Sequence, residues 1–374
     1  MAYEEFTQSA LVTRYNDVYL VAGARTPFAD YNGVLRDVNP IDMGIFAARA
    51  LFERSGIPAA DVQSVVAGNM AQAGFDAYYL PRHIGLYSGV PATAPAMLAT
   101  RICGTGFETI LQAANQIALG SAQVVLAVGA ESMSRNPVAA YTHRSGFRMG
   151  QIEFKDFLWE AFTDPATRQG MGNTAENVAQ KYGITREDVD AYAAQTFARA
   201  NAAWDTGYYN DEVAPVSNAE FALDGYQSRF LKLADRQQVF ARDEHVKPTS
   251  LETLQKLKPA FKGVQTGGNS SAIVDGAVAN TDKPPKLAKT KEHSIDLVAF
   301  DGKLSALDRA TFDRALGFGK GSLKVRQANG TEELISTTRT CPRCGVGVPE
   351  IDPRWFSFNT KQGRCEACEG TGVE

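Results

Sequence analysis

The chain has 374 residues, a length that provides for two or three domains and a sizeable core. With 44% hydrophobic and 21% charged residues, the composition excludes a disordered or fibrous chain, and no apolar run approaches the roughly 20 residues of a membrane helix. The net charge of −4 favours neither a nucleic acid nor a membrane surface as partner.

The first residues, Met1-Ala-Tyr-Glu-Glu-Phe, are acidic where a secretory signal peptide is basic, and no apolar stretch follows them. We therefore expect a cytoplasmic protein. In that reducing compartment cysteines remain thiols or metal ligands.

The first 135 residues alternate between strand-like and helix-like patterns. Strands are predicted over 17–25, 64–70 and 124–130, and helices over 41–54, 82–88 and 104–119. Asn39 and Pro40 form a plausible start for the first helix. Strands that alternate with helices predict an α/β layered domain with mostly parallel pairing.

The pattern loosens after Pro137 and returns as helices over 174–182 and 186–203, the second capped by Thr185. A glycine-rich turn at 267–271 precedes a short apolar run, and Pro284-Pro285 marks a boundary near residue 281. We divide the chain into an α/β domain over 1–135, a loop subdomain over 136–265, a return to the α/β domain over 266–281, and a C-terminal segment over 282–374.

Four of the five cysteines form two C-x-x-C pairs with twenty residues between them: Cys341, Cys344, Cys365 and Cys368. Such spacing allows two tight turns to complete a tetrahedral thiolate shell around zinc. Because four thiolates leave no open position, the metal is expected to be structural. The alternative is a pair of disulfides.

The fifth cysteine, Cys103, lies between an apolar stretch and a helical pattern, at a strand-to-helix junction. The positive end of a helix dipole favours the thiolate, which is the nucleophilic form of cysteine. A buried and inert cysteine is the alternative on this position alone.

Six segments resemble, in order, motifs of the thiolases, which exchange acyl groups between coenzyme A thioesters. They are Arg25-Thr-Pro-Phe, Arg101-Ile-Cys-Gly-Thr-Gly, Gly129-Ala-Glu-Ser-Met-Ser, Met171-Gly-Asn-Thr-Ala-Glu-Asn, Leu257-Lys-Pro-Ala-Phe and Gly267-Gly-Asn-Ser-Ser-Ala-Ile-Val-Asp-Gly-Ala. The resemblance covers residues 17–279 and corresponds to the N-terminal half of a thiolase. It implies a layered α/β/α half-domain with an inserted loop subdomain that binds acyl-CoA.

This resemblance also implies roles for three residues. Cys103 would be the acylated nucleophile, Met171 would line the acyl pocket, and Ser271 would contact the pantetheine arm of coenzyme A. A packed methionine and a turn-capping serine are the alternatives for the last two. Thiolase halves pack against each other, so the resemblance implies a homo-oligomer as well.

Complete thiolases have a second half with a Gly-His-Pro histidine, an Asn-Glu motif and a second acid/base cysteine. The four histidines here, His83, His143, His245 and His293, form no such motif. Because carbon deprotonation needs a base and oxyanion donors, we expect impaired condensation and thiolysis, whereas acyl transfer onto Cys103 demands less. We also expect the strand after the glycine-rich turn to be cut short near Ala279, with an exposed sheet edge.

Residues 282–374 resemble a piece of UvrA, the DNA-damage recognition component of the bacterial excinuclease. The matching segments are Lys291-Glu-His-Ser-Ile-Asp, Phe312-Asp-Arg-Ala-Leu-Gly-Phe-Gly-Lys-Gly, Cys341-Pro-Arg-Cys, Pro349-Glu-Ile-Asp-Pro-Arg-Trp-Phe-Ser-Phe-Asn and Cys365-Glu-Ala-Cys-Glu-Gly-Thr-Gly. They imply a UvrA-like zinc module with four cysteine ligands. The segment around Lys320 lacks the spacing and hydroxyl of a phosphate-binding loop, so no ATP site is expected.

The sequence is compatible with two functions from different classes. The first is a thiolase-type acyltransferase that acts on acyl-CoA through a Cys103 acyl-enzyme, with a structural zinc in its tail. The second is a non-enzymatic binding protein, or a chimera of two gene fragments, whose zinc-stabilised tail contacts DNA or protein.

Overall fold

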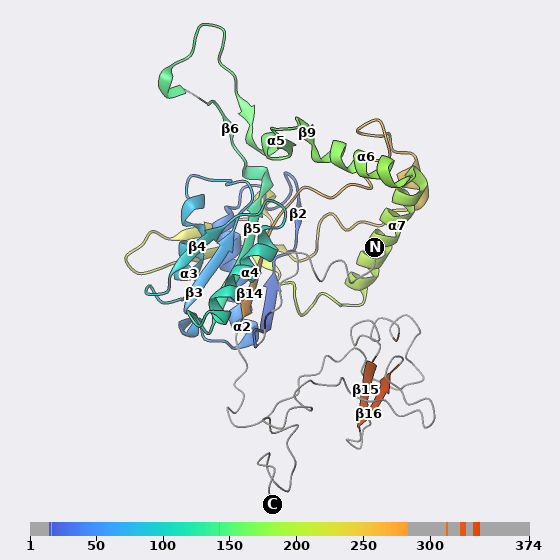
Figure 1. Cartoon of the computed structure of the whole chain (residues 1–374). Coiled ribbons are helices and arrows are strands. Elements are labelled where there is room, and N and C mark those ends of the chain that lie inside the picture. Colours follow the sequence, from blue (N-terminus) through green and yellow to red (C-terminus); the bar gives the residue numbers. More distant parts are fainter. Residues whose placement is uncertain are drawn as a thin grey trace, which may run out of the picture. The chain divides into compact units, whose positions relative to one another are not determined.

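The computed structural model describes residues 15, 17–141, 143–282, 312, 322–326 and 332–336 (Figure 1). The chain divides into two units, Met1–Lys286 and Leu287–Glu374. In the second unit, β15 (Ser322–Arg326) pairs antiparallel with β16 (Glu332–Ser336). The four cysteines of the predicted zinc module lie outside the described residues. In the part of the chain described, no helix is long and apolar enough to span a bilayer.

The first unit is built on a mixed sheet whose strand order is β1-β14-β5-β3-β4, with β2 also paired to β14. The strands are β1 (Leu20–Arg25), β2 (Ala29–Asp30), β3 (Ser64–Gly68), β4 (Ala96–Ala99), β5 (Val125–Ser132) and β14 (Val274–Asp282). Pairing is parallel only among β4, β3 and β5, and β14 runs antiparallel to β1, β2 and β5. The expectation of mostly parallel pairing is therefore wrong.

The direction of β14 follows from where the chain re-enters the sheet. Asp275, near the start of β14, pairs with Ser132 at the end of β5, so the two strands run in opposite directions. β14 lies between β1 and β5 and extends to Asp282 (Figure 1). The expected cut near Ala279 and the exposed edge there are also wrong, because β14 is paired on both sides.

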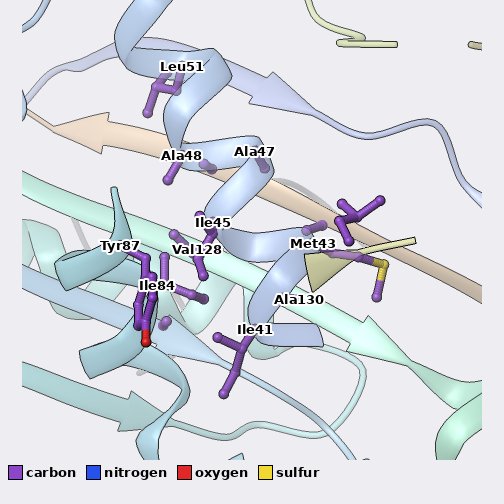
Figure 2. Packing of buried hydrophobic residues seen from close by; sticks show 14 of the residues in the cluster. Ile41, Met43, Ile45, Ala47, Ala48, Leu51, Ile84, Tyr87, Val128 and Ala130 are labelled. Atoms are coloured by element: carbon purple, nitrogen blue, oxygen red, sulfur yellow. The ribbon is translucent and has the colours of Figure 1, made fainter. Parts of the chain in front are cut away.

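Helices cover both faces of this sheet. α2 (Pro40–Ser55) and α3 (Leu80–Tyr87) pack on the face to which β5 contributes Leu126, Val128 and Ala130. Figure 2 shows Ile45 and Ile84 beside Val128 in this layer. α4 (Thr105–Ala118) packs on the other face, against the alternate residues Val125 and Ala127. The side-chain period of two along a strand thus places a helix layer on each side of the sheet.

α2 begins and ends where its sequence dictates. The Asn39 side chain accepts a hydrogen bond from the Ile41 backbone N–H, and Pro40 occupies the first turn, where no N–H partner is needed. The helix ends at Gly56, whose φ of 67° is left-handed. Three-residue 3₁₀ turns, η1 (Ala59–Asp61) and η2 (Ala77–Tyr79), flank β3 and lead into α3.

The chain leaves the sheet after β5 and re-enters it at β14, and this excursion is drawn in green through yellow to orange in Figure 1. Its helices are α5 (Phe157–Ala161), α6 (Met171–Tyr182), α7 (Arg186–Asp205) and α8 (Leu251–Gln255), with 3₁₀ turns η3 (Met133–Arg135), η4 (His143–Ser145) and η5 (Ala234–Arg236). Its strands are short hairpin pairs: β6 (Val138–Ala139) with β7 (Lys155–Asp156), β8 (Thr163–Asp164) with β9 (Gln169–Gly170), β10 (Val216–Ser217) with β13 (Val239–Phe240), and β11 (Ala219–Phe221) with β12 (Arg229–Leu231).

Ion pairs between partly buried side chains help to attach this excursion to the sheet domain. Arg25 at the end of β1 donates to Glu212 and Asp243, each at 2.8 Å. Arg229 of β12 donates to Asp42 of α2 at 2.5 Å and to Asp76 at 3.0 Å. Because these partners are far apart in sequence, the ion pairs fix the excursion against the first 80 residues.

Candidate functional site

A cavity of about 820 Å³ opens between the sheet domain and the excursion. Its lining includes all three residues singled out in the thiolase-like part of the sequence: Cys103, Met171 and Ser271. They come from three distant segments, so the fold brings them together. Most of the remaining lining is apolar, with aromatic rings from Phe28, Trp159, Phe162 and Phe261.

Cys103 is exposed and lies in the turn between β4 and α4, one residue before the Gly104 N-cap. The turn is held by its backbone, since Gly104 N–H donates to Arg101 O at 3.0 Å and Thr105 N–H to Ile102 O at 3.1 Å. The Thr105 hydroxyl accepts from Arg101 N–H at 2.8 Å and donates to Ile102 O at 2.6 Å. The thiol thus stands beside the positive end of the α4 dipole.

Ile102, directly before the cysteine, has a φ of 48°. A left-handed backbone is unfavourable for a β-branched residue and persists only where the surrounding contacts impose it. The hydrogen bonds of the 100–105 turn are those contacts. Strain is therefore concentrated next to the thiol.

Gly68 at the end of β3 lets the first turn of α4 approach the sheet closely. A Cβ at this position would lie 2.8 Å from the Ala99 carbonyl oxygen and would also overlap the Thr105 methyl group. Only glycine fits this contact without a shift of backbone. The position of the Cys103 turn over the sheet thus depends on a residue in another strand.

Met171 is the first residue of α6 and is 48% exposed. Its N–H donates to the Phe162 carbonyl at 3.1 Å, which joins the start of α6 to the β8–β9 hairpin. The next residue, Gly172, lies under the ring of Phe261, which a side chain would displace. Met171 therefore presents a flexible apolar side chain to the cavity from a well-fixed backbone.

Ser271 lies at the end of the glycine-rich turn and is exposed on the cavity. The turn is anchored by Asn269, whose side-chain N–H₂ donates to buried Asp190 of α7 at 2.8 Å and to the Val264 carbonyl at 3.0 Å. The hydroxyl that bonds within the turn is that of Ser270, which donates to Thr266 O at 2.7 Å. Ser271 also borders a second cavity of about 560 Å³ beside α7.

Glu131 lines the same cavity as Cys103. It lies in one of the six thiolase-like segments of the sequence, but the sequence patterns gave it no role. Burial raises the pKa of its carboxyl group to about 7, although hydrogen bonds from the backbone of Met70 and Ala71 and from Asn69 oppose the rise. The nearby Asp275 of β14 adds charge repulsion, and burial raises the pKa of Asp275 as well. A charged residue inside the apolar β5 segment was the available signal, but its burial depends on pairing with β14.

The described residues contain no group of three or more side chains able to hold a metal ion. The cavity instead combines an exposed thiol, an apolar wall and a few polar groups. That combination suits a flexible, largely apolar ligand and attack by sulfur on a polarised carbon.

Comparison with known proteins matches residues 18–280 to a family model described as "Thiolase, N-terminal domain". The chain is 42% identical over 266 residues to the mitochondrial 3-ketoacyl-CoA thiolase of Pongo abelii, with coverage of 70% of this chain and 64% of that protein. It is 36% identical over 343 residues to the acetyl-CoA acetyltransferase of Thiocystis violacea, with 90% and 78% coverage.

Among solved structures, the human mitochondrial 3-ketoacyl-CoA thiolase in complex with CoA superposes with a TM-score of 0.66 at 40% sequence identity. This match covers 71% of this chain and 64% of that one. The chain therefore spans somewhat less than two thirds of the length of these 3-ketoacyl-CoA thiolases.

Proposed function

Because this chain belongs to the thiolase family, we propose that it is an acyltransferase that accepts an acyl group from an acyl-CoA thioester onto the thiol of Cys103. The observation that carries the proposal is one cavity lined by Cys103, Met171 and Ser271 together. The CoA named in the human 3-ketoacyl-CoA thiolase structure supports the substrate class.

The proposed step replaces one thioester by another. The Cys103 sulfur attacks the thioester carbonyl carbon, the bond from that carbon to the coenzyme A sulfur breaks, and the released thiolate takes up a proton. This exchange is nearly balanced in free energy because a thioester is both broken and formed. The α4 N-terminus stabilises negative charge at the attacking sulfur.

Positions in the cavity suggest how the substrate is held. Met171 and the aromatic rings around it would contact the acyl chain, and Ser271 would contact the pantetheine arm. The apolar wall orients the thioester beside Cys103, since effective concentration in such a site accelerates a bimolecular step strongly. Carbon–carbon condensation and thiolysis are not part of this proposal, because the 3-ketoacyl-CoA thiolases extend over about a third of their length beyond the part that this chain matches.

Incubation with acetyl-CoA followed by peptide mass analysis tests the proposed transfer. We expect an acetyl group on Cys103 that hydroxylamine removes, and none in Cys103→Ala. Thiolysis of acetoacetyl-CoA is assayed in parallel to distinguish full turnover from the half-reaction. An unmodified Cys103 in folded protein, while iodoacetamide labels it readily, would show that it is not the acyl acceptor.

A second proposal concerns the C-terminal segment, residues 282–374, and rests on the spacing of its cysteines. We propose one structural zinc per chain bound by Cys341, Cys344, Cys365 and Cys368, in a module that resembles part of UvrA. Metal analysis of purified protein tests it, with a quadruple cysteine-to-serine variant as control. Stoichiometric zinc in that variant would overturn the assignment, and salt-dependent DNA binding by the full chain would favour the non-enzymatic alternative.

A further inference from the structure

Glu131 lines the cavity, and its carboxylate is hydrogen-bonded to the loop that follows β3. It has no role in the acyl transfer proposed above. Its Oε2 accepts from Met70 N–H at 2.6 Å, and its Oε1 accepts from the Asn69 side-chain N–H₂ at 3.0 Å. Both oxygens are thus occupied by donors from the residues that follow β3. Met70 itself lines the cavity.

Asn69 connects this carboxylate to the turn that carries the nucleophile. It is 1% exposed, and its amide also donates to the Ala130 carbonyl at 2.8 Å. Its own backbone carbonyl accepts from the Thr100 hydroxyl at 3.0 Å. Thr100 begins the turn in which Arg101, Ile102 and Thr105 hold Cys103.

We propose that Glu131 is a positioning residue whose ionised carboxylate fixes Asn69 and Met70 and, through the Asn69–Thr100 hydrogen bond, orients the Cys103 turn. The left-handed conformation of Ile102 makes that turn dependent on outside contacts, because it is not a conformation that isoleucine adopts unaided. The inference rests on the proposed function in one respect: Cys103 is the reacting thiol.

Protonation of the carboxyl group would weaken this arrangement. A neutral carboxyl gains an O–H donor and loses its charge, so it accepts from Met70 and Asn69 more weakly than the carboxylate does. The charged group that faces Glu131 is Asp275 of β14, and its carboxylate raises the pKa of Glu131. Asp275 accepts a hydrogen bond from the Ser134 N–H at 3.0 Å, and repulsion from Glu244 contributes to raising the pKa of Asp275. Since burial and Asp275 raise the pKa of Glu131 to about 7, the switch lies near neutral pH.

The test is the rate at which iodoacetamide alkylates Cys103 in the full chain, measured from about pH 5.5 to 8.5 with peptide mapping. Glu131→Gln keeps the shape but presents an amide N–H₂ where an acceptor is needed. We expect the ratio of wild-type to Glu131→Gln rates to be near one at low pH and to rise about three- to tenfold with a midpoint near 7.

Three further variants sharpen the result. Asp275→Asn removes the facing charge and should move the midpoint of the wild-type profile to lower pH. Thr100→Val breaks the link at its other end and should abolish the Glu131-dependent component in an otherwise intact chain. Glu212→Gln, which removes a carboxylate bonded to Arg25 instead, is the matched control and should leave the profile unchanged.

A ratio that does not vary with pH, or an unchanged profile in Thr100→Val, would overturn the inference. If Glu131→Gln does not fold, Thr100→Val and Asp275→Asn still decide it. Failure of the proposed function looks different: acetyl-CoA would leave Cys103 unmodified in every variant, while the alkylation profiles kept the dependence described.

Discussion

Glu131 combines a raised pKa with hydrogen bonds that connect β5 to the loop after β3. It ends the apolar run of β5, and its side chain is held by donors from the loop after β3. Burial is the dominant influence on it and raises its pKa from 4.5 to about 7. A group tuned in this way binds a proton in the folded protein over a pH range in which the unfolded chain has released it.

This difference predicts how stability varies with pH. Between pH 4.5 and 7 the folded state holds more protons at Glu131 than the unfolded state, so the free energy of unfolding falls as pH rises through this window. At about 1.4 kcal/mol per pH unit, the decline attributable to Glu131 is up to about 3 kcal/mol. Urea titrations of the wild type and Glu131→Gln at several pH values measure it. Parallel curves for the two proteins would contradict the prediction.

At the scale of elements, the contact between the first turn of α4 and the end of β3 sets the position of the cysteine turn. Gly68 has no room for a Cβ because of the Ala99 carbonyl and the Thr105 methyl group. At Gly106, within α4, a Cβ would enter open space, with no neighbouring atom within 4 Å. A side chain is therefore excluded at the first glycine and accommodated at the second.

We expect Gly68→Ala to lower the free energy of unfolding by roughly 1–3 kcal/mol, as overpacked core positions do. Gly106→Ala is the control: Gly106 is the second residue of α4, and alanine there should leave the free energy of unfolding unchanged or raise it by up to about 1 kcal/mol, since alanine has the higher helix propensity. Denaturant unfolding measures both. Equal effects of the two substitutions would show that α4 does not depend on the close approach at Gly68.

Sequence patterns predicted the longer elements well and the site in part. The helix predicted over 41–54 is α2, and that over 186–203 is α7 with the expected Thr185 cap, because caps and apolar periodicity are local signals. The two-residue strands of the excursion were missed, since two residues carry no periodicity. The direction of β14 and the burial of Glu131 were beyond reach, because both depend on pairing between segments remote in sequence.

On the scale of the whole molecule, the excursion is attached to the sheet domain by a shared apolar core, to which it contributes Val216, Phe221, Leu231, Leu233 and Phe240, and by a few charged pairs. Arg229 is central to this attachment, with side-chain exposures of 15% for Arg229 and 8% for Asp42. Burial raises the pKa of Asp42 despite the neighbouring guanidinium, so the carboxylate relies on Arg229 to remain ionised. The cavity depends on this attachment, because its two sides come from the two parts it joins.

Arg229→Leu should therefore lower the free energy of unfolding by about 3–5 kcal/mol, since it leaves Asp42 buried without its partner. Arg36→Leu is the matched control: Arg36 pairs with Asp235, which is 64% exposed, and solvent screens such a pair so strongly that its loss should change stability little. Thermal unfolding of both variants provides the measurement. A small loss in Arg229→Leu would mean that apolar packing, and not charge, attaches the excursion.

The place of β14 between β1 and β5 has a consequence for synthesis on the ribosome. β1 is made first, but its partner in the sheet is β14, and residues 133–273 intervene after β5. At about 5–20 residues per second, β1 waits roughly seven to thirty seconds for that strand after β5 has emerged. During this interval the nascent chain displays an unpaired apolar strand, which is the form that chaperones bind and that neighbouring polysomal chains can capture.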